Sequence, residues 1–173
     1  MYDLFVTVVL GGITAFGFFN PSFQLLIPLC LIVLVVKQNE LKPITVTSYF
    51  ISLHTFGSLW LMVPIHVIGG VNFILASFLI CVLGSFFGAI YGMVYRGLQH
   101  LNQKKFYLST FLLFPTSIVI AEFFKLKLIG GFPFLLFTNY FVGSHYQFLI
   151  PYLGIYGCCW LLILACSTLG SLL

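Results

Sequence analysis

The sequence predicts an all-α membrane protein, a polytopic bundle of about six transmembrane helices with one re-entrant or interfacial segment. Hydrophobic residues make up 61% of the 173 residues, and charged residues make up 6%. Mean hydropathy is +1.17. Soluble domains carry about 25% charged residues, so this chain has too little polar surface to face water. The composition excludes a soluble enzyme, a disordered chain and a nucleic-acid-binding protein.

One membrane domain is expected over residues 1–173, because about 20 residues are needed for each span and no segment has a soluble composition. The expected elements are a helical hairpin over 1–36, two long spans over 44–95, a fifth span over 106–124, a re-entrant segment over 125–147 and a sixth span over 148–173.

The first two apolar runs are each shorter than a full span, and Asn20-Pro21 separates them. We therefore expect a tight hairpin with this turn at its tip. The next two runs are long, and Gly69-Gly70 separates them. A stripe of small residues at i, i+4 and i+8, namely Gly84, Gly88 and Gly92, favours close helix packing in the fourth run.

The fifth and sixth runs each contain a proline. Pro115 lies inside the fifth, where neighbouring helices can satisfy the carbonyl it leaves free. Pro151 lies in the first turn of the sixth, where proline is best tolerated. The stretch 125–147 between them is apolar but broken by Gly130, Gly131 and Pro133. This pattern predicts a re-entrant or interfacial segment covered by protein.

Two basic clusters indicate the orientation in the membrane. They fall within 37–42 and 96–105, two spans apart, so they share a side. The positive-inside rule makes that side cytoplasmic, with the N-terminus on it and 125–147 on the opposite side. Lys125 and Lys127 then lie on the outer side, so the positive-inside rule does not account for their presence.

Common catalytic motifs are not found in the sequence, and we expect no catalytic residue, metal site or cofactor in it. His54 and His66 lie about 18 Å apart along one helix and cannot share a metal. The five cysteines all sit in apolar segments, which favours small apolar fillers over disulfides or nucleophiles.

Glu122 is the most informative of the acidic residues, because Lys125 follows at i+3 on the same helix face. An ionisable residue near the membrane interior is costly, and pairing lowers the cost. The pair has two interpretations: an ion pair that holds the helix end, or one that shapes a lipid or substrate entrance. Trp60, Gly69 and Gly70 near the outer face are likewise either interface anchors or part of an entrance.

Three blocks of the sequence resemble the N-terminal membrane region of the apolipoprotein N-acyltransferase family. The strongest joins 121–125, with Glu122 and Lys125, to the step Gly131-Phe132-Pro133-Phe134 and to the helix entry at 150–157. The second contains Trp60 and Gly69-Gly70, and the third is the turn at 15–21. The sequence departs from the family by having Lys125 where Arg is usual and Phe134 where Trp is usual.

The resemblance implies a bacterial inner-membrane, multi-pass protein of lipoprotein maturation. Complete members move an acyl chain from a phospholipid, through a Cys thioester, to the amino group of a lipoprotein. A periplasmic nitrilase-like domain carries their Cys, Glu and Lys. Nothing in these 173 residues resembles that domain. We therefore expect a truncated member, and whether this chain is itself an enzyme stays open.

By this resemblance the chain contributes access for lipid and substrate, with phospholipid, lipidated lipoprotein and a separately encoded nitrilase-like domain as partners. The entrance candidates are Trp60, Gly69, Gly70, Glu122, Lys125, Gly131, Phe132, Pro133 and Phe134. The alternative is a stand-alone, catalytically inactive lipid-binding or scaffold protein. A small transporter is a third interpretation, but repeat symmetry and polar helix interiors are not seen.

Overall fold

The computed structural model describes residues 2–36, 42–101, 112–131 and 133–173. Within these ranges the chain forms helices and turns and no strand, which confirms the predicted all-α class. The elements are α1 (Tyr2–Phe19), η1 (Pro21–Phe23), α2 (Leu26–Val36), α3 (Pro43–Gly57), η2 (Leu59–Leu61), η3 (Val63–Ile68), α4 (Phe73–Leu101), α6 (Phe114–Leu128), η5 (Phe137–Tyr140), η6 (Gln147–Leu149) and α7 (Ile150–Leu172).

Three helical segments are long and apolar enough to cross a membrane: Pro43–Ile68, Phe73–His100 and Gln147–Leu172. The apolar helices Leu4–Phe19 and Pro21–Val36 are shorter. The fifth expected span is described only from residue 112 onward, because 102–111 lie outside the described residues. The basic residues of the expected cytoplasmic loops that fall in 37–41 and 102–111 lie outside them too.

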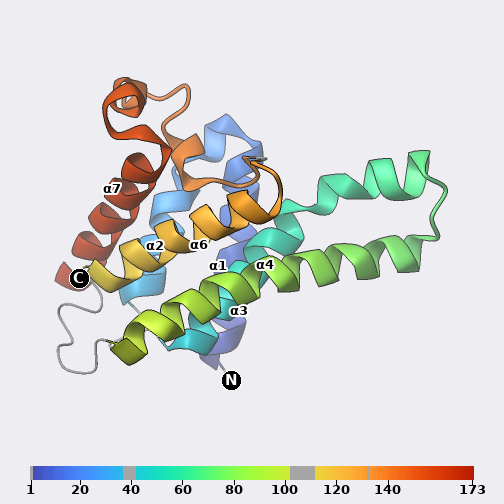
Figure 1. Ribbon diagram of the computed structural model, residues 1–173, viewed down its shortest axis with the longest axis horizontal. Coiled ribbons are helices and arrows are strands. Elements are labelled where there is room, and N and C mark those ends of the chain that lie inside the picture. Colours follow the sequence, from blue (N-terminus) through green and yellow to red (C-terminus); the bar gives the residue numbers. More distant parts are fainter. Residues whose placement is uncertain (1, 37–41, 102–111, 132) are drawn as a thin grey trace.

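The helices pack as a closed ring (Figure 1). Going round it, α3 contacts α4, α4 contacts α6, α6 contacts α7, α7 contacts α2, α2 contacts α1, and α1 contacts α3. Aromatic side chains fill its core, and the largest fully buried ones include Tyr49, Phe50, Tyr91 and Phe114. The segment with η2 and η3 and the start of α4 extend to the right in Figure 1 as a hairpin beyond the other helices.

The small-residue stripe of α4 packs directly on α3. A Cβ added at Gly84 would meet Thr55, one at Gly88 would meet Ile51, and one at Gly92 would meet Thr47. At Gly88 the added atom would lie 2.6 Å from the Ile51 Cα, so the two backbones leave no room for a side chain. The packing role predicted for this stripe is confirmed.

The segment that follows α3 departs from regular α-helical geometry. After Gly57 the chain continues through the 3-10 turn η2 and the π-helix η3, in which Pro64 occupies the first turn and removes a backbone donor. Farther along the chain, α6 continues past residue 124, the expected end of the fifth span, to Leu128. It therefore includes both Lys125 and Lys127. The irregular part between α6 and α7 begins only after this helix.

We expect Gly88→Leu to lower the free energy of unfolding by about 1–3 kcal/mol, the usual cost of overpacking a tight interface. Titration with SDS in mixed detergent micelles, followed by circular dichroism, measures this. Gly97→Leu is the matched control on the same helix, because a Cβ there meets nothing within 4 Å. Equal effects of the two substitutions would contradict the close contact between α3 and α4.

Candidate functional site

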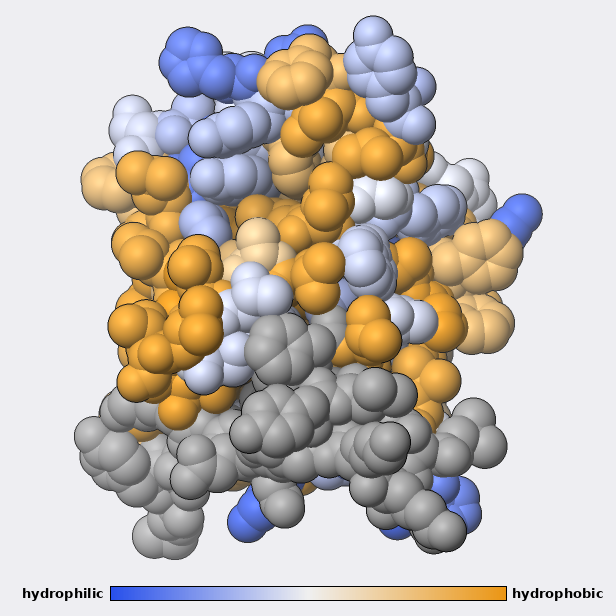
Figure 2. All heavy atoms as spheres, turned by 90° about the vertical axis from the view of Figure 1, so that its left-hand side faces the viewer, coloured by the Kyte–Doolittle hydropathy of each residue, from blue (hydrophilic) through white to orange (hydrophobic). Residues whose placement is uncertain are grey.

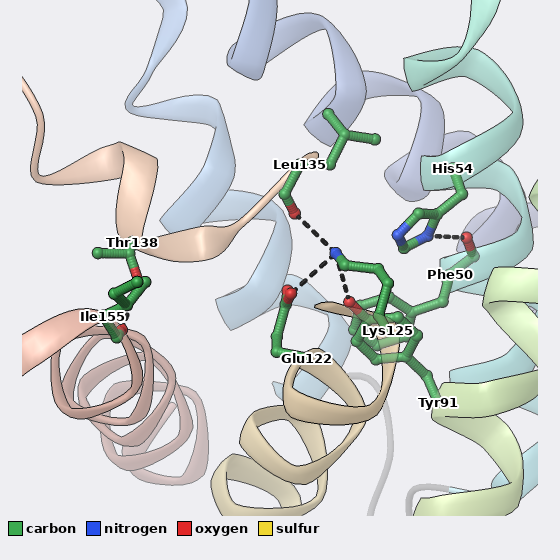
Figure 3. A network of polar contacts seen from close by, with 8 residues as sticks. All are labelled: Phe50, His54, Tyr91, Glu122, Lys125, Leu135, Thr138 and Ile155. Atoms are coloured by element: carbon green, nitrogen blue, oxygen red, sulfur yellow. Dashed lines mark hydrogen bonds and ion pairs between the residues drawn. The ribbon is translucent and has the colours of Figure 1, made fainter. Parts of the chain in front are cut away.

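A buried ion pair lies at the centre of the candidate site (Figure 3). The Nζ of Lys125 is 2.8 Å from the Oε2 of Glu122, one turn earlier on α6, and the exposed fractions of the two side chains are 0% and 1%. The i, i+3 spacing places both on the helix face that looks into the ring. Burial is tolerated because each charge neutralises the other in a medium that solvates neither.

Lys125 also joins α6 to two other parts of the chain. Its ammonium donates to the hydroxyl of Tyr91 on α4 at 3.0 Å and to the carbonyl oxygen of Leu135 at 3.4 Å. With Glu122, these acceptors account for all three N–H groups of the lysine. The Tyr91 ring in turn stacks on Phe50 of α3, with centroids 3.9 Å apart and planes inclined by 7°.

Leu135 holds an unusual backbone conformation at this contact. Its φ of 48° makes it the one non-glycine residue with a positive φ in the described part of the chain. Such a conformation costs energy for a residue with a side chain, and it persists where the surroundings enforce it. Here Lys125 holds the carbonyl, and the side chain packs against Gly57, where an added Cβ would overlap it.

His54 completes the network from α3. It is fully buried, and its Nδ1 lies 2.9 Å from the carbonyl oxygen of Phe50. A carbonyl only accepts, so Nδ1 carries a proton and donates it; in the neutral ring Nε2 then presents a lone pair. That Nε2 has no hydrogen-bond partner among the described residues. The ring lies 5.2 Å from that of Tyr91 and 6.4 Å from that of Phe134, measured between centroids.

An apolar groove opens beside the network, between α1 and the end of α3. Its volume is about 360 Å³. The lining residues are Gly12, Ala15, Phe16, Phe19, Phe56, Leu59 and Trp60. Trp60 lies at one side of it and reaches Phe134, with ring centroids 6.3 Å apart. Phe134 is therefore a neighbour both of the groove residue Trp60 and of His54.

The structure brings some of the predicted entrance residues together and separates others. Trp60, Phe134, Lys125 and Glu122 are linked by the contacts described above. Gly131 and Pro133 are exposed in the turn that leads to them, and Phe132 lies outside the described residues. Gly69 and Gly70 lie between η3 and α4, in the turn at the far tip of the hairpin in Figure 1.

Sequence reasoning missed two members of the network, Tyr91 and His54. Each comes from a different helix, and the contacts that bring them into the network cross between helices. His54 was considered only as a metal ligand, and the described residues contain no group of three or more His, Cys, Asp or Glu that could hold a metal. The cysteines that the structure describes are free, and Cys81 alone of them is exposed.

Known proteins match this chain over most of its length. The family described as Apolipoprotein N-acyltransferase N-terminal domain matches residues 10–168. The chain is 27% identical over 161 residues to Apolipoprotein N-acyltransferase of Pasteurella multocida, covering 91% of this chain and 30% of that protein. It is 25% identical over 176 residues to Apolipoprotein N-acyltransferase of Haemophilus influenzae, covering 99% and 33% respectively. The chain thus spans about a third of the length of these curated relatives.

We expect Lys125→Met and Glu122→Gln each to lower the free energy of unfolding by about 3–5 kcal/mol, because each leaves a buried group without its partner. The double substitution should cost less than the sum of the two, since it removes both members of the pair. Detergent unfolding of the parent protein, the two single variants and the double variant gives the coupling energy between Glu122 and Lys125.

Lys127→Met is the control for lysine loss on the same helix, because Lys127 is exposed and its ammonium lies over the Phe123 ring. It should leave stability nearly unchanged. Strict additivity of the Glu122 and Lys125 substitutions would show that the two side chains do not act as a pair.

Proposed function

The chain belongs to the apolipoprotein N-acyltransferase family through its N-terminal domain, and from this premise we propose that it supplies the lipid-access part of N-acyl transfer to lipoproteins. In this proposal it lies in the bacterial inner membrane with its N-terminus in the cytoplasm. It receives an acyl chain of a phospholipid or a lipidated lipoprotein from the bilayer. A nitrilase-like domain on the outer side, encoded separately or in the same protein, performs the transfer.

The observation that carries this proposal is the contact of Trp60 with Phe134. Trp60 lines the apolar groove and contacts Phe134. The residue after Phe134 is Leu135, whose carbonyl oxygen accepts a hydrogen bond from Lys125. A groove lined by Phe16, Phe56 and Trp60 suits a hydrocarbon chain, because its lining side chains are apolar apart from the indole N–H of Trp60. The groove therefore leads from the lipid-facing side of α1 to a part of the chain whose position is fixed by a buried charge pair.

Complementation tests the role directly. A strain depleted of its own N-acyltransferase would express this chain alone, or together with a separately encoded nitrilase-like domain. Rescue by the pair only is the expected result. Rescue by neither would favour the alternative of a catalytically inactive lipid-binding or scaffold protein, and rescue by the chain alone would contradict a role confined to access.

We expect Gly12→Leu to lower photocrosslinking to a phospholipid with a reactive acyl chain. An added Cβ would already lie 3.3 Å from the Phe56 ring, so a leucine side chain would occupy the groove. The acyl chain would lose about six to ten carbon contacts with the groove, which weakens its binding free energy by about 1 kcal/mol. This corresponds to a roughly fivefold fall in its affinity for the groove.

Gly97→Leu serves as the control, because it adds the same side chain to an open position on α4 away from the groove. Crosslinked peptides identified by mass spectrometry should map to α1 and η2 in the parent protein. An unchanged yield with Gly12→Leu, or labelling spread evenly over all the helices, would exclude the groove as an acyl-chain site.

A further inference from the structure

The connection between α6 and α7 forms a separate small body at one end of the bundle. We call residues 133–153 the α6–α7 cap. It lies at the upper left in Figure 1, at the opposite end of the molecule from the N-terminus. Its composition is unusual for a connector that leaves the membrane: after Lys127 the sequence contains no Asp, Glu, Lys or Arg. A water-facing segment of this length would carry about one charged residue in four.

The cap satisfies much of its backbone internally. Successive i to i+3 hydrogen bonds join Asn139 N to Leu136 O, Phe141 N to Thr138 O, Val142 N to Asn139 O, Ser144 N to Phe141 O, Gln147 N to Ser144 O and Leu149 N to Tyr146 O, at 2.9–3.2 Å. Gly143 N donates to the side chain of Gln147 at 3.0 Å. Internal pairing of this kind is needed where water is scarce and is optional where it is plentiful.

The cap has an inner and an outer side. Phe137 and Phe141 point into the core, where their exposed fractions are 0% and 5%. Tyr146, Phe148 and Tyr152 point outward, and Tyr152 is 83% exposed. The outer surface also carries Asn139, His145 and Gln147. Figure 2 shows this mixture at its upper end, above a middle zone in which apolar side chains predominate.

The end of the cap is a sharp change of backbone direction. Gly154 has φ 66° and ψ −178° inside α7, a conformation that L side chains rarely adopt. The hydroxyl of Thr138 donates to the carbonyl oxygen of Ile155 immediately beyond it, which ties η5 to the part of α7 after the kink. The chain thus changes direction at Gly154, between the first turn of α7 and the rest of that helix.

We propose that the α6–α7 cap lies in the headgroup layer of the bilayer, with Tyr146, Phe148 and Tyr152 inserted among the lipids as anchors. Tyrosine suits this layer because its ring is apolar and its hydroxyl is polar. The absence of charge in this sequence segment disfavours bulk water. The exposed amide and imidazole groups of the cap disfavour the hydrocarbon interior that a re-entrant segment would enter. The inference does not depend on acyl transfer.

Depth-dependent fluorescence quenching tests the location. The full chain with Trp60→Phe and Trp160→Phe would carry a single reporter, either Tyr152→Trp or Phe148→Trp, in phosphatidylcholine–phosphatidylglycerol vesicles. Lipids brominated close to the headgroup should quench each reporter about twofold more than lipids brominated near the chain ends, as expected for a side chain at the interface. Aqueous iodide should quench it only weakly.

The reference is the protein with Trp60→Phe alone, in which Trp160 reports from inside α7 and should respond most to the deep label. Quenching of the cap reporters by iodide alone would place the cap in water, and quenching mainly by the deep label would make it re-entrant. Insensitivity to every quencher would mean that protein covers it. Each of these three results overturns the proposal, and unchanged helical circular dichroism checks that the variants fold.

Discussion

The buried pair of Glu122 and Lys125 is the interaction on which the arrangement of the site depends. A single charge in the interior of a membrane protein is unfavourable, so the lysine needs acceptors for each of its N–H groups. It finds one on its own helix, one on α4 and one on the backbone at Leu135. Satisfying the charge therefore requires three parts of the chain to occupy fixed relative positions, and apolar packing alone would not specify them so closely.

The turn after α6 receives its conformation from this requirement. Leu135 would relax from its positive φ if its carbonyl and side chain were free. Lys125 donates a hydrogen bond to the Leu135 carbonyl oxygen, and Gly57 leaves room for the Leu135 side chain. Phe134 is thereby placed next to Trp60, which lines the apolar groove, and next to His54 of the polar network. A charge pair on one helix thus determines where an aromatic side chain from the turn meets the residues of an apolar groove.

Local patterns in the sequence were enough for the helical class, the glycine stripe of α4 and the pairing of Glu122 with Lys125. Each depends on hydropathy or on i, i+3 and i, i+4 spacing within one helix. Tyr91 and His54 could not be found this way, because their contacts cross between helices. The hydropathy pattern also predicts that the fifth span ends at residue 124, because a lysine such as Lys125 is taken to be exposed. Pairing buries this lysine, and α6 continues to Leu128.

The groove and the cap are joined through the turn that Lys125 holds. Phe134 contacts Trp60 at the groove, and the same short stretch continues through Phe137 into the cap. Because Phe137 packs against both Phe18 of α1 and Phe50 of α3, the cap cannot shift in depth without disturbing the helices that form the groove. If the cap rests among the headgroups, the groove residue Trp60 is held at a fixed distance from them. An acyl chain bound in the groove, as proposed, would then have a fixed depth relative to the headgroups.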